Sequence, residues 1–378
     1  MAILHLNHSG AGLPSSETTA TIVNHLSLEA QIGPMEAGTV AADAIQGTYL
    51  AASKLLGCSP DEIAFGSSHG QLYGNLISAI PLSKGDEVLI SRQEWTGNVL
   101  SLQRCVELSG ASLSLMASDE LSAVDPVALL ERLTPKVRIV AFTWIGAGST
   151  LINPAAAVGA AIRRASSSAF FIIDASQAIG QLPINVSELG CDALIGCGRK
   201  FLRGPRGTAL ANVSPRLAAE LRPRSIDNHS STLGKGSVIV ANSARALEFG
   251  ETSVALQLGL GKAIDQALDL GVDNIRLQLD HKAELLRKAL AGVQNLRMLD
   301  LGKCKSASVT FAVDGMSCAT VKQRLDKRAN IGMNGPNYTP YDMAMRGITE
   351  LLRASVHLST TDDDIALFAD AIRSIQLH

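Results

Sequence analysis

The first two thirds of the chain alternate between short apolar runs and segments whose apolar residues have helical spacing. Runs of consecutive apolar residues are typical of strands that are buried on both faces of a sheet. Their alternation with helical segments is the βαβ pattern of a mostly parallel sheet flanked by helices. The predicted strands cover residues 63–65, 87–90, 112–116, 137–142, 170–174, 192–197 and 208–212.

Two of the helices between these strands have clear N-terminal signals. Asp125 and Pro126 precede a helix predicted over residues 127–133, and Ser214 and Pro215 precede another predicted over residues 216–221. A serine or aspartate N-cap followed by proline at the first helical position is a common helix start. Both signals therefore support the α/β interpretation.

The pattern changes after about residue 255. Long helical stretches cover 256–270 and 274–293, strand-like runs cover 306–313 and 351–357, and residues 361–364 cap a last helix. We therefore expect an α/β protein with a large domain at residues 16–255, whose mostly parallel sheet is flanked by helices. Residues 256–378 would form a smaller α+β domain, which residues 1–15 join as an N-terminal arm.

Composition and charge narrow the class of protein. A length of 378 residues fits two domains, and a net charge of −2 gives no reason to expect nucleic acid or a membrane surface as partner. No apolar stretch is long enough to span a bilayer, and the N-terminus lacks the pattern of a secretory signal. The six cysteines have no metal-ligand spacing. These features predict a soluble cytoplasmic protein with reduced thiols and no metal.

Two neighbouring predicted strands end in residues that suit pyridoxal 5′-phosphate (PLP). Asp174 lies at the carboxyl end of one strand, where open α/β sheets bind ligands, and Lys200 follows the next strand. PLP requires a lysine for its Schiff base and a carboxylate that keeps its ring nitrogen protonated. Either residue alone would more often be a surface lysine or an ordinary strand-end aspartate. In this order they predict a PLP enzyme in which Lys200 is catalytic and Asp174 binds the cofactor.

Around both residues, at 170–177 and 196–207, the chain resembles a fold-type I PLP enzyme of the class V aminotransferase and cysteine desulfurase group. The resemblance runs nearly end to end and implies a homodimer with active sites at the subunit interface. It also implies further cofactor contacts: the phosphate at a helix N-terminus formed by Ser68, His69 and Gly70, ring stacking by Trp95, the phenolic oxygen at Gln177, and a phosphate contact from Arg199.

The resemblance also implies substrate contacts. Arg353 matches the arginine that binds the substrate α-carboxylate, a task that suits its planar guanidinium, although a surface arginine is the alternative. Asn7 and Asn98 would assist it. Many relatives have threonine after the glycine at position 250, to reach the partner subunit's phosphate, but Glu251 stands there in this chain. That contact would therefore fall to Thr252.

Departures from the family pattern indicate which branch of the family the chain resembles. A cysteine desulfurase needs a nucleophilic cysteine on a loop that corresponds to residues 331–338, and this loop contains none. Transfer of sulfur through a protein persulfide is therefore disfavoured. The motif at residues 247–251 and the run from Arg353 to His357, together with Glu94 and Asn98, look like the branch that contains the C–S lyase of ergothioneine biosynthesis.

The resemblance implies β-elimination at a small-molecule cysteine S-conjugate, with Lys200 as the base that removes the Cα proton. Hercynylcysteine sulfoxide is one candidate substrate. Elimination would release pyruvate, ammonia and a sulfenate, and reduction of that sulfenate by a thiol reductant would give ergothioneine. The alternatives are a class V aminotransferase, an epimerase or a desulfurase-like enzyme that acts on another amino acid. A cofactor-free interaction protein on a decayed enzyme scaffold is a further alternative. Trp144 either lines the substrate channel or packs in the core.

Overall fold

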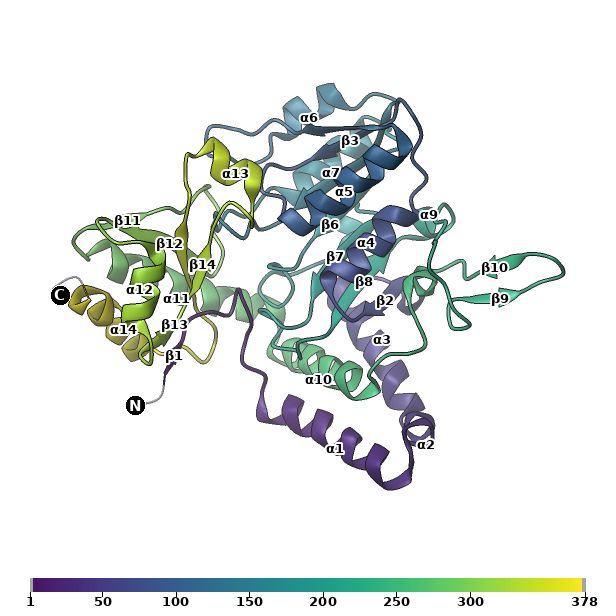
Figure 1. Ribbon diagram of the computed structural model, residues 1–378, viewed down its shortest axis with the longest axis horizontal. Coiled ribbons are helices and arrows are strands. Elements are labelled where there is room, and N and C mark those ends of the chain that lie inside the picture. The colour runs from purple at the N-terminus through teal and green to yellow at the C-terminus, as the bar shows by residue number, and fades with distance from the viewer. Residues whose placement is uncertain (1–2, 376–378) are drawn as a thin grey trace.

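The computed structural model describes residues 3–375, which form two parts that lie side by side (Figure 1). The larger part contains a seven-stranded sheet. Its strands, in order across the sheet, are β2 (Ile63–Gly66), β8 (Ala209–Val213), β7 (Ala193–Cys197), β6 (Phe170–Asp174), β5 (Val137–Thr143), β3 (Glu87–Ile90) and β4 (Ser112–Leu115). Strands β7, β6, β5, β3 and β4 are parallel, whereas β8 is antiparallel to both of its neighbours. The expected mostly parallel sheet is confirmed.

Strand β6 shows why these segments are apolar at consecutive positions. All of its residues are buried. Phe171 and Ile173 belong to the hydrophobic core on one face of the sheet, and Phe170 and Ile172 belong to the core on the other face. Successive side chains of a strand point to opposite faces, so a strand covered on both faces needs an apolar residue at every position. Only the last residue of β6, Asp174, is polar.

Helices cover both faces of this sheet. One core includes residues of α3 (Ala42–Leu56), α6 (Pro126–Arg132), α7 (Ala155–Arg164), α8 (Val186–Leu189) and α10 (Val254–Leu270). The other includes residues of α4 (His69–Ala79), α5 (Thr96–Ser109), α9 (Pro215–Ala218) and the 3₁₀ helix η2 (Ala244–Leu247). The remaining helices of this part are α1 (Ser16–Ile32), α2 (Pro34–Val40) and the 3₁₀ helix η1 (Pro60–Glu62).

The smaller part contains an antiparallel sheet with helices on it. Its strands, in order, are β11 (Leu296–Met298), β12 (Ser308–Val313), β15 (Leu351–Ser355) and β14 (Gly332–Asn334). Its helices are α11 (Val272–Ala291), α12 (Cys318–Leu325), α13 (Pro340–Met345) and α14 (Asp362–Ser374). The N-terminal arm lies along this part, because β1 (Leu4–His5) pairs with β13 (Ala329–Asn330) and Asn7 forms a β-bridge with Ser355.

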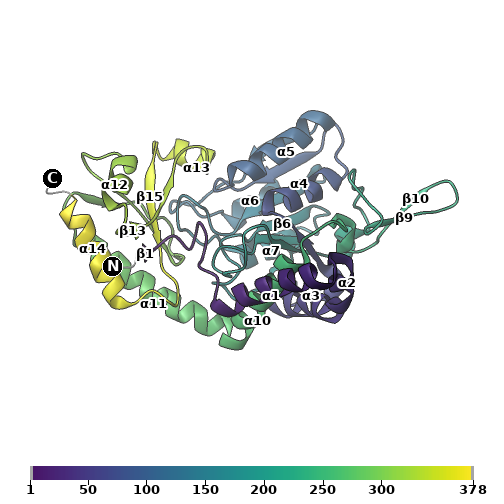
Figure 2. The ribbon, with the colours of Figure 1, turned by 60° about the horizontal axis from the view of Figure 1, so that its bottom comes forward.

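The two parts are joined where α10 passes into α11. Helix α10 packs against α1 and α3, whereas α11 packs against α14 and β12. Gly271 connects them with a φ of 75°, a conformation that residues with a Cβ rarely adopt. Figure 2 shows the two helices running along one side of the molecule, from the larger part to the smaller. By its packing α10 therefore lies with the larger part, whereas the boundary predicted at residue 255 placed most of this helix in the smaller domain.

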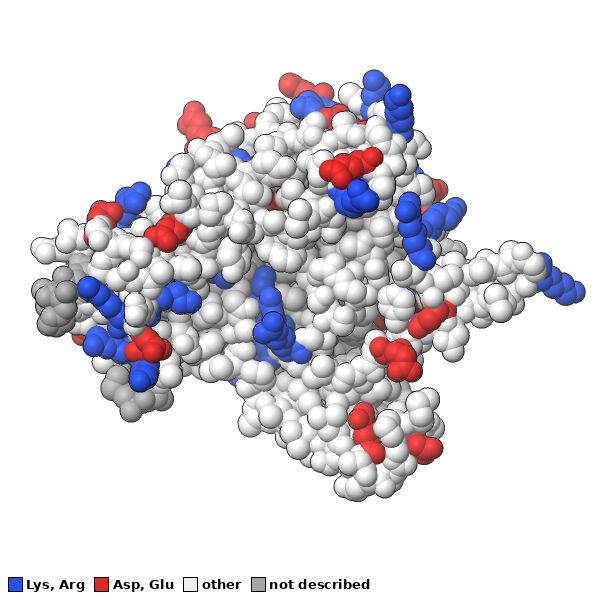
Figure 3. Space-filling model, in the orientation of Figure 1, with Lys and Arg blue, Asp and Glu red and all other residues white. Residues whose placement is uncertain are grey.

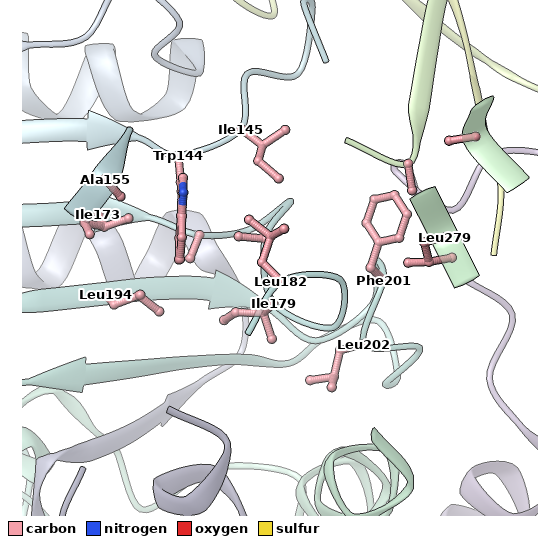
Figure 4. Packing of buried hydrophobic residues seen from close by; sticks show 14 of the residues in the cluster. Trp144, Ile145, Ala155, Ile173, Ile179, Leu182, Leu194, Phe201, Leu202 and Leu279 are labelled. Atoms are coloured by element: carbon pink, nitrogen blue, oxygen red, sulfur yellow. The ribbon is translucent and has the colours of Figure 1, made fainter. Parts of the chain in front are cut away.

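One hydrophobic cluster extends through the junction between the parts. Trp144 and Ile173 at the sheet, Phe201 after β7 and Leu279 on α11 all belong to it (Figure 4). Trp144 is 7% exposed and lies beside Ala155 and Ile173. Of the two roles that the sequence left open for Trp144, the structure supports packing in the core.

The elements predicted from the sequence agree with the structure within a few residues. Strands β3 and β6 have the predicted bounds, whereas α9 ends earlier than predicted and β15 ends at Ser355. Helices α1 to α3 had no counterpart among the predictions. In α1 the buried residues are Thr18 and His25, so its apolar side chains do not form the buried stripe that identifies an amphipathic helix.

A hairpin of β9 (Ser231–Leu233) and β10 (Val238–Val240) projects from the larger part (Figures 1 and 2). Its base is fixed by Asp227, whose carboxylate accepts backbone hydrogen bonds from His229, Ser230 and Gly250.

Within residues 3–375, no helix is both long enough and apolar enough to cross a lipid bilayer.

Candidate active site

A cavity of about 630 Å³ lies between the two parts, at the carboxyl ends of β5, β6 and β7. The N-terminal arm and strands β14 and β15 complete its wall. The basic residues that line it are Arg199, Lys200, Arg206, Lys322 and Arg353, and Asp174 is the one acidic residue among the described lining residues. Basic side chains also gather near the centre of the face drawn in Figure 3. This charge distribution suits an anionic ligand.

Asp174 is buried at the end of β6, and both of its carboxylate oxygens are hydrogen-bonded. Oδ1 accepts from the backbone N–H of Ser176 at 2.8 Å, and Oδ2 accepts from Nδ2 of Asn98 at 2.8 Å. Burial by itself would raise the pKa of Asp174, but the nearby His69 and Lys200 and these hydrogen bonds lower it below its ordinary value. Asp174 is therefore an oriented carboxylate that stays ionised at neutral pH.

Lys200 lies on the loop that follows β7, and its side chain reaches the same cavity. Two backbone hydrogen bonds close this loop, from Gly204 to Gly198 and from Arg203 to Lys200. A Cβ at Gly198 would lie 2.4 Å from Oγ1 of Thr208, so the loop passes its neighbour too closely for a larger residue. Burial lowers the pKa of Lys200, and Arg199 and Arg353 act in the same direction. The neutral, nucleophilic form of the amine is thereby favoured.

The N-terminus of α4 forms another section of the wall, with Ser68, His69 and Gly70. The Ser68 hydroxyl caps the helix by accepting from the backbone N–H of Gln71 at 3.1 Å. The first N–H groups of a helix have no partner inside the helix, so this end can bind a phosphate. Arg199 also lines the cavity, and its Nη1 donates to the carbonyl of Gly10 at 3.0 Å.

Gln177 and Trp95 lie on the cavity wall, as the sequence led us to expect. Nε2 of Gln177 donates to the carbonyl of Ser9 at 3.0 Å, which ties the N-terminal arm to the end of β6. Oε1 of Gln177 is buried without a hydrogen-bond partner. Trp95 is the N-cap of α5 and contacts His69 edge to face, with ring centroids 5.9 Å apart.

The wall contributed by the smaller part presents Arg353, Asn7 and Asn334. Nη1 of Arg353 donates to the carbonyl of Ala147 at 2.7 Å, whereas its Nε is buried without a partner. Burial lowers the pKa of Arg353 to about 10, so the guanidinium keeps its charge at neutral pH. Oδ1 of Asn7 is also buried without a partner. The charged guanidinium of Arg353 lines a cavity that can hold a carboxylate, whereas Oδ1 of Asn7 can only accept a hydrogen bond.

Two expected site residues lie outside the cavity wall. Asn98 is fully buried, and its side chain is occupied by Glu94, Asp174 and His69. The expected contact between Asn98 and substrate is therefore replaced by a contact with Asp174. Thr252 is exposed just before α10 and does not line the cavity of its own chain. Its expected contact with a partner subunit's phosphate stays a prediction.

Several residues that contact Asp174 or line the cavity were not predicted from the sequence. Ser176 binds Asp174 and the His69 ring, Asn334 and Tyr338 line the cavity from the loop noted only for its lack of cysteine, and Lys322 lines it from α12. The spacing of Glu94 and Asn98, four residues apart, was a usable signal for their contact. No local pattern points to Lys322 or Asn334.

The wall suits a planar phosphorylated cofactor with a basic ring nitrogen. It offers a buried carboxylate at Asp174, an amine at Lys200, a helix N-terminus at residues 68–70 and an unpaired amide oxygen at Gln177. These are the groups that PLP requires, and the residues present fit that cofactor. Cys197 is the one cysteine that lines the cavity among the described residues.

Comparisons with known proteins agree on one family. The model of the family described as aminotransferase class-V matches residues 22–368. A probable cysteine desulfurase of Xylella fastidiosa (strain Temecula1) is 26% identical over 353 residues, 90% of this chain and 82% of that protein. A probable hercynylcysteine sulfoxide lyase of Mycobacterium tuberculosis is 26% identical over 389 residues, 98% and 90% of the two chains. The cystine C–S lyase C-DES, solved with glycine covalently linked to its PLP cofactor, superposes with a TM-score of 0.88 at 19% identity, covering 98% of this chain and 96% of its own.

Proposed function

The chain belongs to the aminotransferase class-V family of PLP-dependent enzymes and has the fold-type I architecture, and from this we propose that it is a C–S lyase. Its substrate would be a cysteine S-conjugate. The products would be pyruvate, ammonia and a thiol, or a sulfenate when the substrate is a sulfoxide.

One observation carries the choice of a lyase over a persulfide-forming desulfurase. The loop that lines the cavity from the smaller part presents Met333, Asn334 and Tyr338, but no thiol. Cys197 lies on the opposite wall, on the strand that leads to Lys200. A sulfur atom released from the substrate therefore has no thiolate on that loop to receive it, and it would leave as part of a small molecule.

The roles of the chain's residues follow from their chemistry. Lys200 and Asp174 would hold PLP, with the helix N-terminus at residues 68–70 at its phosphate. Bound PLP supplies an electron sink for the charge left when the Cα proton is removed. Arg353 would bind the α-carboxylate, and Asn7, with its unpaired Oδ1, would orient the amino group. The neutral amine of Lys200 would take the Cα proton, because burial favours its uncharged form.

We propose hercynylcysteine sulfoxide as a specific candidate substrate, which would place the enzyme in ergothioneine biosynthesis in the cytoplasm. The proposal is supported by the relative of that name, which aligns with almost the whole chain. The excess of basic side chains on the cavity wall is compatible with a substrate that has a second carboxylate in addition to its α-carboxylate.

We propose that the active form is a homodimer. Large apolar side chains are exposed on adjacent helices α1, α2 and α3: Val23, Leu26, Met35, Val40 and Leu50. Exposed apolar patches of this kind mark protein–protein contacts, and homodimers bury them against a second copy. In such a dimer the exposed Thr252 would contact the cofactor phosphate of the partner subunit.

The test is an assay of pyruvate release from a panel of cysteine S-conjugates that includes hercynylcysteine sulfoxide. We expect stoichiometric pyruvate without an added keto acid. Lys200→Ala should abolish both pyruvate release and the visible absorbance of the bound cofactor, whereas Lys288→Ala, at a surface lysine, should change neither. Keto-acid dependence would indicate an aminotransferase, inversion at Cα an epimerase, and persulfide formation from cysteine a desulfurase. Each of these results would reject the lyase assignment.

A further inference from the structure

The imidazole of His69 makes contacts that a phosphate-binding residue does not need. His69 is the first residue of α4 and is 8% exposed. Its Nε2 lies 2.9 Å from Oδ1 of Asn98 and 3.4 Å from Oδ2 of Asp174, and its Nδ1 lies 3.0 Å from the hydroxyl of Ser176. The resemblance assigned this position to the cofactor phosphate, which the backbone N–H can serve. The side chain faces the opposite end of the site.

The contacts of Asn98 determine which ring nitrogen of His69 carries a proton. Nδ2 of Asn98 donates to Oε2 of Glu94 at 3.1 Å and to Oδ2 of Asp174 at 2.8 Å. Both partners are carboxylate oxygens, so the amide orientation follows from the network, and Oδ1 of Asn98 must face His69. Nε2 of His69 then meets only acceptors, Asn98 Oδ1 and Asp174 Oδ2, and therefore carries hydrogen.

The other ring nitrogen of His69, Nδ1, also has a polar partner. It lies 3.0 Å from the hydroxyl of Ser176, which can either donate or accept a hydrogen bond. The same residue donates its backbone N–H to Oδ1 of Asp174. His69, Asn98 and Ser176 thus surround the carboxylate of Asp174 and define one orientation for it. The closeness of His69 also contributes to the lowered pKa of Asp174.

We propose that His69 is a positioning residue that keeps Asp174 oriented and ionised for the ring nitrogen of the cofactor. This inference rests on the proposed role of Asp174 in binding PLP. It assigns to His69 an action that passes through Asp174 and not directly to the cofactor. This role can be tested specifically, because removal of the His69 imidazole should not change PLP affinity once the Asp174 carboxylate is absent.

A double-mutant cycle with cofactor affinity as the readout tests this signature. PLP would be removed by dialysis and returned to wild type, His69→Leu, Asp174→Asn and the double variant, and the dissociation constant measured by absorbance and fluorescence. We expect His69→Leu to weaken PLP binding roughly tenfold or more, the effect of one charge-assisted hydrogen bond. The same change in the Asp174→Asn background should alter affinity less than about twofold.

Two further variants make the test independent of folding effects. His69→Gln keeps a donor close to the position of Nε2 and should retain part of the affinity that His69→Leu loses. His281→Leu, at an exposed histidine on α11, should leave the affinity unchanged. Equal losses from His69→Leu in both backgrounds would overturn the inference, because His69 would then act without Asp174. Unchanged affinity in Asp174→Asn alone would instead refute the role of Asp174 itself.

Discussion

Replacing Glu94 with glutamine should make the chain more stable at pH 8 and change its stability much less at pH 5. Glu94 is fully buried, and its carboxylate accepts from Oγ of Ser91 at 2.7 Å and from Nδ2 of Asn98 at 3.1 Å. Glutamine has nearly the same shape. Its carbonyl can accept from Asn98 while its amide donates to Ser91, so the substitution removes the charge and retains two hydrogen bonds.

The size of the effect follows from the pKa of Glu94. Burial raises this pKa from 4.5 to about 7, and the neighbouring charge of Asp174 adds to the rise. A carboxyl group with a raised pKa binds its proton more tightly in the folded state. Its contribution to stability is therefore complete below pH 4.5 and is lost as the pH rises through 7. At about 1.4 kcal/mol for each pKa unit, the loss between pH 5 and pH 8 is about 2–3 kcal/mol.

Urea unfolding of the cofactor-free protein at several pH values between 5 and 8 measures this effect. The difference in unfolding free energy between Glu94→Gln and wild type should shift by about 2–3 kcal/mol in favour of the variant across this range. Glu131→Gln, at an exposed carboxylate on α6, is the matched control and should follow wild type at every pH. Parallel stability curves for Glu94→Gln and wild type would show that Glu94 does not titrate in this range, and would refute the reasoning.

Two other substitutions test the carboxylate site and the packing of the larger part. Arg353→Ala should raise KM for amino-acid substrates by about tenfold to a hundredfold, because a buried charged hydrogen-bond partner is lost; steady-state kinetics that match wild type would move the carboxylate site elsewhere. Gly159→Ala would place a Cβ 1.8 Å from the carbonyl oxygen of Leu189 and should destabilise the chain by about 2 kcal/mol. Gly47→Ala, in α3 with open space around the new Cβ, should stabilise the chain by about 0.5–1 kcal/mol. Urea titration measures both variants, and a similar loss of unfolding free energy in the two would contradict the packing argument.

Local sequence features were sufficient to predict the seven strands of the large sheet. A strand buried on both faces needs apolar residues at consecutive positions, and β6 and β7 have them. Helix caps are equally local, as in α14, where Thr361 and Asp364 form the predicted capping box. Helices α1 and α2 escaped prediction because much of their apolar surface is exposed in the single chain, so burial imposes no helical period on it. Helix α3 was also missed, although one of its faces is buried.

In the candidate site, too, the residues at strand ends could be predicted from local sequence, whereas the contacts between distant segments could not. The order of Asp174 and Lys200 after successive strands was enough to predict a PLP site, because each residue lies at the end of its own strand. The contacts around Asp174 could not be predicted in this way. His69 is 105 residues from Asp174 and Asn98 is 76 residues from it. These side chains meet only because the fold brings α4, which follows β2, and α5, which follows β3, to the end of β6 from opposite sides of the sheet order.

The sequence by itself thus predicted which segments form the sheet and which two residues we propose to hold the cofactor, since burial periodicity, caps and strand ends are properties of a few consecutive residues. The tertiary structure alone decided that Asn98 serves Asp174 and not the substrate, that Glu94 is a fully buried carboxylate, and that Ala147 accepts from both Arg353 and Asn334. Each of these depends on side chains from distant segments that share one desolvated space. Their hydrogen bonds and pKa values are set by that space, and no local pattern encodes it.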